Sequence, residues 1–587
     1  MLKRTHTCGE LSISNLGLRV SLNGWISKRR DLGGLIFFDL RDRYGVTQIV
    51  FDSNESKDAF ETAKKLSYED VIGISGEVIA RPDEAINKNM VTGFIDIKVN
   101  SIIVYNESNP VPFDINDRNS AAEDHRLKYR YLELRTKELQ KNMLIRHQAA
   151  LATREFLSKK DFIEIETPIL MKSTPEGARD FLVPSRLHHG RFYALPQSPQ
   201  TYKQLLMVSG FDKYFQIVKC FRDEDFRADR QPEFTQIDIE MSFVNQDDII
   251  NLGTSLTQYL WKKVLDIDLP NEFPHLTYKE SMENYGSDKP DIRFDMQLLE
   301  FSSYVNSSDF DTFKNILKSG GRVKALKCPN SESYSRKKID ELTSWLKEYY
   351  GVKGLAWMKC SNGTLDSGIS KFFSDEIKLK IINDFDINDN EILFIIGDSE
   401  STVLHSLGAL RLRLARNENL IDDNKWAPLW VVDFPLVDWN EDSKRWDALH
   451  HPFTSPNFED IDLLDKSPGE VRSLGYDIVM NGYELGGGSI RIHESNLQAK
   501  IFELLGVGKK EAEEKFGFLM NAFKYGAPPH GGMAFGFDRI IMLLAGSKQI
   551  RDVIAFPKTT SAISLMDNSP SNVSDDQLSE LGISLND

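Results

Sequence analysis

The 587-residue sequence has few cysteines, and no two of them lie close together. Cys8, Cys220, Cys328 and Cys360 lack CxxC spacing, which argues against a zinc knuckle or a disulfide framework and suits a reducing cytoplasm. The chain also lacks any run of the ~18 uncharged apolar residues that a membrane helix needs. No apolar segment of the secretory type follows the first six residues. We therefore expect a cytoplasmic protein without a membrane-spanning segment.

An excess of basic charge is also missing. The 72 Lys and Arg residues face 88 Asp and Glu residues, giving a net charge of −16, which by itself disfavours a polyanionic partner. The charge is uneven, however, because residues 1–50 carry eight basic and four acidic side chains, whereas residues 566–587 carry five acidic and no basic ones. A local basic surface can still bind RNA, so overall charge does not decide between RNA-binding and other functions.

The N-terminal hundred residues alternate between apolar and polar positions as short strands do. Five strands are predicted, with one helix at about 56–66 between the third and the fourth: 18–27, 35–39, 46–51, 71–78 and 94–104. This order is typical of an OB-type β-barrel, a fold that binds single-stranded nucleic acid on exposed aromatic rings. Phe37, Phe38 and Phe51 could form such a platform beside Arg29 and Arg30. Each of these rings could equally fill the barrel interior.

The remaining chain is too long for one hydrophobic core, so we predict an α/β multidomain protein. Pro110 and Pro112 mark a linker, followed by helical patterns at 123–138 and 138–158. From about residue 292 to 409 the pattern of predicted elements changes to mixed helices and strands. Because the motifs lie on both sides of this segment, it indicates an inserted α+β domain. The predicted organisation is a barrel at 1–107, a linker or hinge at 108–138, a motif-bearing domain in two parts at 139–291 and 411–565, an insertion at 292–410, and an acidic tail at 566–587.

The first motif that carries chemistry is Phe221-Arg-Asp-Glu224, followed after a loop by a second segment at 233–240. Residues two apart on a strand share a face, so Arg222 and Glu224 project together. If the second segment returns antiparallel, Phe234, Gln236, Asp238 and Glu240 share a face as well. A guanidinium can hold a phosphate or carboxylate, and a ring can stack on a base. A solvent-exposed charged hairpin is the alternative interpretation.

The second motif is an Asn481-Gly482 turn between alternating runs, which strongly predicts a β-hairpin. A two-residue turn places Asp477 and Glu484 on one face, roughly 7–8 Å apart across the strands. Two such carboxylates suit Mg²⁺ holding a polyphosphate. Arg491 is an odd number of positions from Glu484, so on a regular strand it would point to the opposite face. It joins the face of Glu484 only if the glycines at 486–488 introduce a bulge. An edge hairpin with solvated acids is the alternative.

The third motif is a glycine-rich strand, 531–536, that runs through Phe537-Asp538-Arg539 into an apolar helix. Such a strand lets backbone approach a nucleotide, and the helix N-terminus with Arg539 favours phosphate. It matches neither GxGxxG nor GxxxxGK[ST], so it predicts neither a Rossmann nor a P-loop site.

Taken together, these segments resemble the three motifs of class II aminoacyl-tRNA synthetases. The residues in and between the motifs are similar to those of the bacterial aspartyl type over nearly the whole chain. The segment ending at Pro168 resembles motif 1, which in the family forms a homodimer interface. Asp538 departs from the general class pattern, which has Glu there, but matches the aspartate subgroup. The insertion resembles the GAD domain, which archaeal and eukaryotic forms lack. The resemblance implies an antiparallel-sheet catalytic domain.

The resemblance also implies site residues. Arg222, Glu484 and Arg539 would be catalytic, with Arg222 gripping the ATP α-phosphate and the aspartate carboxylate. The implied ATP site consists of Arg222, Asp223, Glu224, Gln231, Phe234, Glu484, Gly536, Phe537, Asp538 and Arg539. In it, Glu224 would read the adenine amino group, and Phe234 and Arg539 would sandwich the base. Asp477 and Glu484 would ligate Mg²⁺.

L-Aspartate would be recognised by residues from several segments: Glu176, Gln200, Lys203, Arg222, Asp238, His450 and Arg491. Lys203 and Arg491 make physical sense as a pair, because a dianionic substrate requires cations that a neutral amide would leave unpaired. The implied anticodon contacts are Arg30, Asp31, Phe37 and Gln48. The reaction would form aspartyl-adenylate and transfer aspartate to the 3′ end of the aspartate tRNA, releasing AMP and pyrophosphate.

Two rival functions are testable against the same residues. An asparaginyl enzyme, or a paralogue that makes asparagine, should lack the barrel, the insertion or the Lys203/Arg491 pair. A catalytically dead RNA-binding or amidotransferase-partner protein should have lost Arg222, Glu484 or Arg539. All of these features are present. A narrower alternative stays open, because some bacterial-type enzymes also charge the asparagine tRNA. Leu32 leans toward the strict form, and the segment 81–87 does not decide.

Overall fold

The computed structural model describes residues 1–174, 178–224 and 230–585. It divides into two compact units, which are treated separately. The first comprises Met1–Leu144 with Ala555–Thr559 and Ile563–Pro570. The second comprises Ile145–Ile554 with Thr560–Ala562 and Ser571–Asp587. No described helix is long and apolar enough to span a bilayer.

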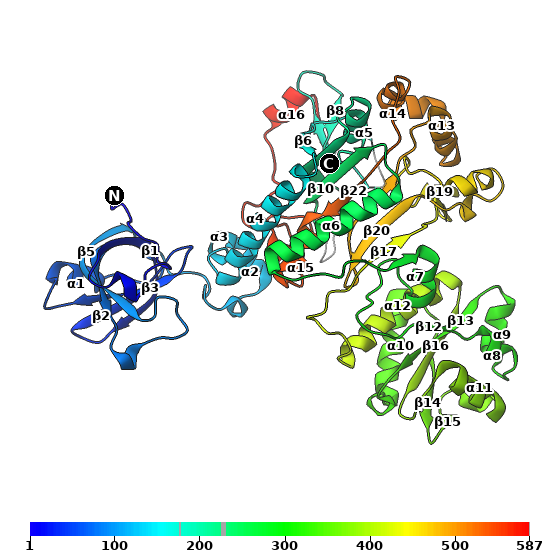
Figure 1. Ribbon diagram of the computed structural model, residues 1–587, viewed down its shortest axis with the longest axis horizontal. Helices are drawn as coiled ribbons and strands as arrows, with labels where there is room; N and C mark the ends of the chain where they lie inside the picture. Colours follow the sequence, from blue (N-terminus) through cyan, green and yellow to red (C-terminus); the bar gives the residue numbers. More distant parts are fainter. Residues whose placement is uncertain (175–177, 225–229, 586–587) are drawn as a thin grey trace. The chain divides into compact units, whose positions relative to one another are not determined.

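The first unit contains a closed five-stranded barrel in the order β1-β2-β3-β5-β4 (Figure 1). Its strands are β1 (Arg19–Asp31), β2 (Leu35–Arg41), β3 (Val46–Asp52), β4 (Val71–Ala80) and β5 (Ile95–Asn106), and α1 (Lys57–Ala63) follows β3. The predicted OB-type barrel is thus confirmed. Phe38 and Phe51 are buried and meet edge to face, with ring centroids 5.2 Å apart. They fill the interior, so of the two interpretations left open for these rings the structure supports the barrel interior and not the external platform.

The hinge that follows the barrel is helical but broken. The pattern at 123–138 predicted one segment, whereas the structure has α2 (Glu123–Lys128), α3 (Arg130–Glu133) and then α4 (Lys137–Ser158). The break falls at Tyr129, whose φ of −109° and ψ of 40° are not helical. The short helices gather cations around the fully buried carboxylate of Glu133, which accepts hydrogen bonds from Arg118, Arg126 and Arg130. Such pairing offsets the cost of burying the Glu133 charge.

The second unit is built on an eight-stranded sheet, mostly antiparallel, as the predicted catalytic fold requires. Its strand order is β11-β17-β20-β21-β22-β10-β9-β6, with parallel pairs only at β11·β17 and β6·β9. The strands are β6 (Ile163–Glu164), β9 (Lys213–Phe221), β10 (Glu233–Ser242), β11 (His275–Thr277), β17 (Pro428–Val432), β20 (Gly475–Met480), β21 (Tyr483–Ile490) and β22 (His530–Gly536).

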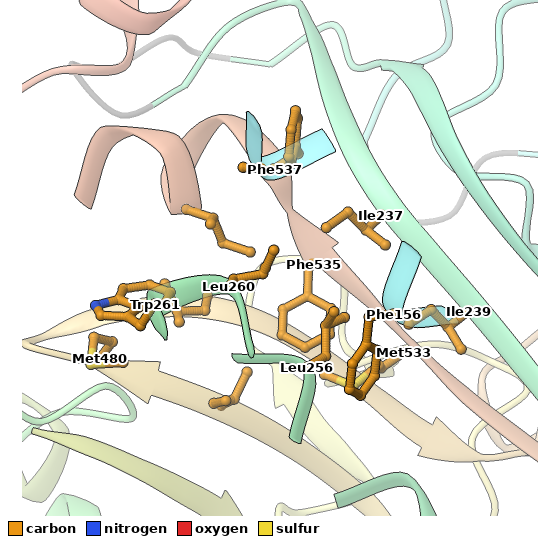
Figure 2. Packing of buried hydrophobic residues seen from close by; sticks show 14 of the residues in the cluster. Phe156, Ile237, Ile239, Leu256, Leu260, Trp261, Met480, Met533, Phe535 and Phe537 are labelled. Carbon is orange, nitrogen blue, oxygen red and sulfur yellow. The ribbon is translucent and has the colours of Figure 1, made fainter. Parts of the chain in front are cut away.

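The main core lies between this sheet and the helices α4, α6 (Gln246–Leu265) and α15 (Phe537–Ala545). Figure 2 shows Leu256, Leu260 and Trp261 of α6 packed with Met533 and Phe535 of β22. Since alternate residues on a strand point to opposite faces, the sheet's other face is left for polar residues that project from β10, β20, β21 and β22.

The insertion has its own five-stranded sheet, in the order β12-β13-β16-β14-β15. It comprises β12 (Leu298–Glu300), α8 (Ser302–Asn306), α9 (Asp311–Lys318), β13 (Arg322–Cys328), α10 (Arg336–Tyr350), β14 (Ala356–Ser361), β15 (Thr364–Asp366), α11 (Asp375–Phe385), β16 (Ile392–Asp398) and α12 (Glu400–Asn417). Both sheet faces are covered: Phe394 and Ile396 join one apolar cluster, whereas Leu393 and Ile395 join the other.

The remaining elements surround the large sheet. They are β7 (Leu182–Pro184), β8 (Phe192–Ala194), α5 (Gln200–Val208), α7 (Tyr278–Tyr285), β18 (Val437–Asn440), β19 (Arg445–Ala448), α13 (Ser495–Leu504), α14 (Lys509–Phe523) and α16 (Asp575–Leu581). Among these, α5 and α7 border the polar face of the sheet, because residues from both line the pocket described below.

Candidate active site

The hairpin β9–β10 places the residues of the first motif. β10 runs antiparallel to β9 and to β22, and its register sets Gln236 opposite Gly536 and Asp238 opposite Ala534. Phe234, Gln236 and Asp238 line two connected pockets on the polar face, so the predicted common face of these residues is confirmed. The glycines of β22 keep this face open beside the β10 side chains: a Cβ on Gly532 would lie 2.1 Å from Glu240 Oε2.

The first pocket has a volume of about 200 Å³ and is lined mainly by polar side chains. Its lining includes Arg222, Glu224, Arg230, Gln231, Phe234, Gln236, Glu484, Gly536, Asp538, Arg539 and Ile550. The Glu224 carboxylate accepts a hydrogen bond from Arg230 (2.5 Å). The Arg539 guanidinium donates to the Glu484 carbonyl oxygen and lies 3.9 Å from its carboxylate. A ring, a carboxylate and several guanidiniums in one small hollow fit a nucleotide with its phosphates.

Two residues predicted for the ATP site do not line the first pocket, and a third lines it with its carboxylate already hydrogen-bonded within the protein. Asp223 does not line the pocket; its backbone N–H donates to Arg179 O (3.1 Å). Phe537 is buried in the main core, as Figure 2 shows. Asp538 lines the pocket, but its carboxylate already accepts from the Thr235 N–H (2.7 Å) and from Arg146 (2.5 Å). Asp538 therefore holds the start of α15 against β10 and α4.

The second pocket is larger, about 420 Å³, and shares Arg222, Gln236, Glu484 and Ala534 with the first. The two pockets therefore adjoin at these residues. The remaining lining comes from several elements and includes Gln197, Ser198, Gln200, Lys203, Asp238, Tyr278, Asp288, Phe434, Leu449, His450, His451, Asp477, Gly487, Ser489 and Arg491.

Four buried charges alternate in sign at the second pocket: Lys203, Asp238 and Arg491 line it, and Glu240 lies behind them. Lys203 Nζ lies 2.7 Å from Asp238 Oδ1 and 3.3 Å from Glu240 Oε2. Arg491 donates to both oxygens of Glu240, at 3.0 and 3.2 Å. Burial alone would raise the pKa of Glu240, but Arg491 and Lys203 hold it at about 2. Burial dominates at Asp238 and raises its pKa to about 6, although Lys203 opposes the rise.

The predicted Asn481-Gly482 hairpin is confirmed. Both residues have positive φ, 53° and 83°, and Val479 pairs with Glu484 as expected. A bulge does reset the face, but it occurs before the first glycine: Ile478 pairs with Gly486, which leaves Leu485 as the extra residue. The extra residue shifts the alternation of side chains along β21 by one position, so Glu484 and Arg491 both line the second pocket.

Asp477 projects from β20 toward this face. A Cβ on its cross-strand partner Gly487 would lie 2.1 Å from Asp477 Oδ1, so glycine is required there. The same oxygen lies 3.1 Å from Nε2 of His450. Burial alone would lower the pKa of His450, but the charge and hydrogen bond of Asp477 raise it. Partial burial and the charge of nearby Asp477 also raise the pKa of Glu484, whose side chain is 42% exposed.

The structure brings together most of the predicted aspartate-binding residues. Gln200, Lys203, Arg222, Asp238, His450 and Arg491 all line the second pocket, whereas Glu176 lies outside the described residues. The sequence interpretation assigned no role to Glu240, although its parity on β10 placed it on the same face. Tyr278, Asp288 and Ser489 were also missed, and no local pattern marks them.

The predicted anticodon residues cluster at one edge of the barrel. Phe37 is half-buried on the strand face opposite the buried Phe38, and it pairs across β1–β2 with Arg30. Arg30 donates to Gln48 Oε1 (2.5 Å) and to Asp39 (3.3 Å). Asp31 lies 3.2 Å from Arg29. A ring beside a guanidinium, a carboxylate and an amide is the combination that binds unpaired bases.

Comparison with known proteins agrees with both parts of this description. Residues 122–560 match the family model described as tRNA synthetases class II (D, K and N), and residues 20–105 match the OB-fold nucleic acid binding domain. The chain is 53% identical to the aspartate–tRNA ligase of Staphylococcus carnosus over 585 residues, covering 99% of each chain. It is 51% identical to the aspartate–tRNA(Asp/Asn) ligase of Caldanaerobacter subterraneus subsp. tengcongensis, covering 100% of this chain and 98% of the relative.

Solved structures of low identity share the fold. Asparaginyl-tRNA synthetase from Pyrococcus horikoshii, complexed with asparaginyl-adenylate, has a TM-score of 0.59 at 19% identity and covers 95% of this chain and 99% of its own. Aspartyl tRNA synthetase from Entamoeba histolytica has a TM-score of 0.58 at 20% identity, with coverages of 95% and 91%. The family model and the relatives at about half identity establish that the chain belongs to the class II tRNA synthetases of the D, K and N group, within the family of bacterial aspartate–tRNA ligases.

Proposed function

We propose that this chain is an aspartate–tRNA ligase, which activates L-aspartate with ATP and transfers it to the 3′ end of the aspartate tRNA. The observation that carries the proposal is the buried pair of cations, Lys203 and Arg491, in a pocket that meets the nucleotide-sized pocket at Arg222. The full-length similarity to aspartate–tRNA ligases supports the same activity.

ATP would occupy the first pocket. Phe234 offers a ring face to the adenine, and Glu224 can accept a hydrogen bond from its amino group. Arg539 and Arg222 would hold phosphate oxygens, since a guanidinium binds such groups bidentately. Because Arg222 lines both pockets, it can contact the α-phosphate and the attacking carboxylate together. The protein needs no nucleophile of its own; it would contribute positioning and charge stabilisation.

Aspartate would place its side-chain carboxylate against Lys203 and Arg491. Asp238 and Glu240 already balance these cations, so the pocket is held in shape before substrate binds. Asparagine would bring a neutral amide to the same place, and an amide cannot form the charged pairs that the aspartate carboxylate would add at these two cations, which is the basis of rejection. After adenylate formation, the terminal ribose hydroxyl of the tRNA would attack the activated carbonyl.

Mg²⁺ would be held by Asp477 and Glu484. Both carboxylates line the second pocket, and Glu484 also lines the first, so the donor set fits an oxygen-ligated cation beside a polyphosphate. Among residues 1–174, 178–224 and 230–585, no group of three metal-ligating side chains forms, so phosphate and water oxygens would complete the shell. When bound, the cation would neutralise the charge of the departing pyrophosphate.

A homodimer would form along the motif 1 segment. Apolar side chains project into solvent from α4, from β6 and from the chain that follows β6: Leu151, Ile163, Ile169 and Leu170 are 48–59% exposed. Apolar surface of this kind is typical of a protein–protein interface. Anticodon recognition would fall to Phe37, Arg30, Asp31 and Gln48 on the barrel.

Aminoacylation with radiolabelled aspartate on two purified transcripts, aspartate tRNA and asparagine tRNA, tests the proposal. We expect charging of the aspartate tRNA, with asparagine as the amino acid giving no product. Charging of both transcripts would identify the non-discriminating form, a property that the names of the relatives leave open because both types occur at about 50% identity. Charging of neither, with active control transcripts, would contradict the proposal.

A further inference from the structure

Helix α7 belongs to two hydrophobic cores at once. Tyr278, its first residue, packs against the cluster around Leu429, Val431 and Phe434 at the edge of the large sheet and also against the insertion core. Met282, one turn later, is buried in the insertion core. Figure 1 shows α7 where the insertion meets the sheet, and it contacts β11, β17, β12 and α12. This short helix is therefore a structural connection between the insertion and the catalytic sheet.

Ionic contacts fix α7 to the insertion. The Glu283 carboxylate accepts two hydrogen bonds from Arg322 (2.6 and 2.8 Å) and one from the buried Lys324 (2.8 Å). Lys324 also donates to the Glu283 carbonyl oxygen (2.7 Å). Partial burial would raise the pKa of Glu283, but the two cations hold it at about 2, so the carboxylate stays charged across the working pH range. Both cations belong to β13, the second strand of the insertion sheet.

Backbone contact fixes the C-terminal end of α7. Gly286 adopts φ +64°, and a Cβ there would lie 2.1 Å from Leu404 O and 2.9 Å from Gly408 Cα. A Cβ on Gly408, in α12, would in turn lie 2.4 Å from Gly286 O. Only glycine at both positions permits this approach. The chain then continues to Asp288, which lines the second pocket.

Contacts between aromatic rings connect the N-terminal end of α7 to the second pocket, which is the proposed aspartate site and is called the amino-acid pocket below. The Tyr278 ring lies 5.2 Å from the Phe434 ring, and the Phe434 ring lies 4.5 Å from the His450 imidazole. His450 in turn contacts Asp477, and all four residues line the second pocket. A shift of α7 would therefore move part of the pocket wall directly, because tightly packed side chains transmit displacements rather than absorb them.

We propose that Glu283 is a positioning residue, through which the insertion holds α7 and thereby sets Tyr278 and Asp288 at the wall of the amino-acid pocket. The inference rests on the proposed function, because it assigns that pocket to aspartate. The first pocket shares no residue with α7, and none of its lining belongs to the insertion. Loss of the Glu283 contacts should therefore weaken aspartate binding and leave ATP binding unchanged.

The test uses ATP–pyrophosphate exchange with the full-length protein, varying aspartate and ATP separately. Glu283→Gln should raise KM for aspartate by roughly five- to tenfold, a moderate coupling, with KM for ATP and kcat close to wild type. Tyr278→Ala removes the ring and leaves the ionic contacts in place. It should likewise raise KM for aspartate, with KM for ATP and kcat close to wild type. The matched control is Glu300→Gln: Glu300 also pairs with Arg322 (2.7 Å), but it lies on β12 rather than α7, so its KM values should stay at wild type.

Several outcomes would overturn the inference. An unchanged aspartate KM in Glu283→Gln would overturn the inference whatever Tyr278→Ala does, because Tyr278 lines the pocket and can act by direct contact. A parallel loss of both KM values and kcat, with a lowered Tm, would indicate a general folding role. An equal effect of Glu300→Gln would assign the change to the insertion's own ion pairs. Wild-type protein that shows no aspartate-dependent exchange would instead contradict the proposed function, so the two failures are distinguishable.

Discussion

The guanidinium of Arg222 lies over the ring of Phe234, with its Cζ 5.2 Å from the ring centroid. These residues are the proposed phosphate ligand and the proposed adenine platform; both line the first pocket, and Arg222 also lines the second. Adenine stacking on the ring face that Arg222 covers would replace this cation–π contact, which is worth about 0.5–2 kcal/mol. Stacking of the base would also free the Arg222 guanidinium to bind phosphate. Binding of the base and binding of the phosphate would then be linked.

Arg222→Ala should therefore abolish adenylate formation while the protein remains folded. Removal of a charge-stabilising donor at a reacting centre typically costs about 10²–10³ in kcat. Arg222→Lys should recover only part of the loss, because an ammonium cannot bind two oxygens in a fixed fork. ATP–pyrophosphate exchange measures the loss, and size-exclusion chromatography checks the assembly state. Near-normal exchange in the alanine variant would contradict the assigned role.

Asp238 provides a prediction about pH. Its pKa is about 6 in the folded protein against an ordinary value of 3.8, so the folded state holds this proton more tightly than the unfolded state. Stability therefore falls as pH rises from about 4 to 6 and is constant above that window. Asp238→Asn cannot titrate. Since one pKa unit corresponds to about 1.4 kcal/mol, wild type should lose roughly 3 kcal/mol relative to the variant across the window.

Denaturant unfolding of both proteins at pH 4, 5, 6 and 7 measures this difference. The absolute offset between the two proteins includes the altered pairing of Lys203, so only the pH dependence of their difference is diagnostic. Curves that run parallel from pH 4 to 7 would show that Asp238 titrates normally in the folded protein.

Local patterns predicted the parts of the site that depend on local geometry. The period of two in β10 placed Phe234, Gln236 and Asp238 together, and the Asn481-Gly482 dipeptide fixed the hairpin register near the turn. The bulge at Leu485 was expected at the glycines because only they lack a Cβ, whereas cross-strand packing decides its position.

Contacts between distant segments could not be predicted in this way. Nothing near Glu283 in the sequence indicates Arg322 and Lys324 as partners, and nothing near Asp538 indicates Arg146. Alternation in β2 shows that Phe37 and Phe38 face opposite sides, but it does not tell which side is the barrel interior. Closure of the barrel decides that Phe38 is buried.

Phe37 and Phe38 consequently form a matched pair for testing RNA binding. Phe37→Ala should weaken tRNA charging about 10- to 100-fold through KM for tRNA, since one base–aromatic stack contributes about 1–3 kcal/mol. Amino-acid activation and Tm should stay at wild type, because the ring is on the outer face. Phe38→Ala removes a fully buried ring and should cost about 3–5 kcal/mol of stability. Equal losses of charging and activation in Phe37→Ala would indicate an unfolded barrel instead.

Asp477→Asn tests the metal assignment. A carboxylate binds Mg²⁺ through a charged oxygen, and an amide oxygen is a weaker ligand for a hard cation. The variant should need about tenfold more Mg²⁺ for half-maximal ATP–pyrophosphate exchange, the effect of losing ~1.4 kcal/mol of cation affinity. Chelation with EDTA should stop exchange in wild type. Saturating Mg²⁺ should restore most of the variant's activity, which serves as the control, because metal does not repair a folding defect.

Asp477 also accepts a hydrogen bond from His450, so a loss that Mg²⁺ does not rescue would assign its main role to holding the imidazole rather than the cation.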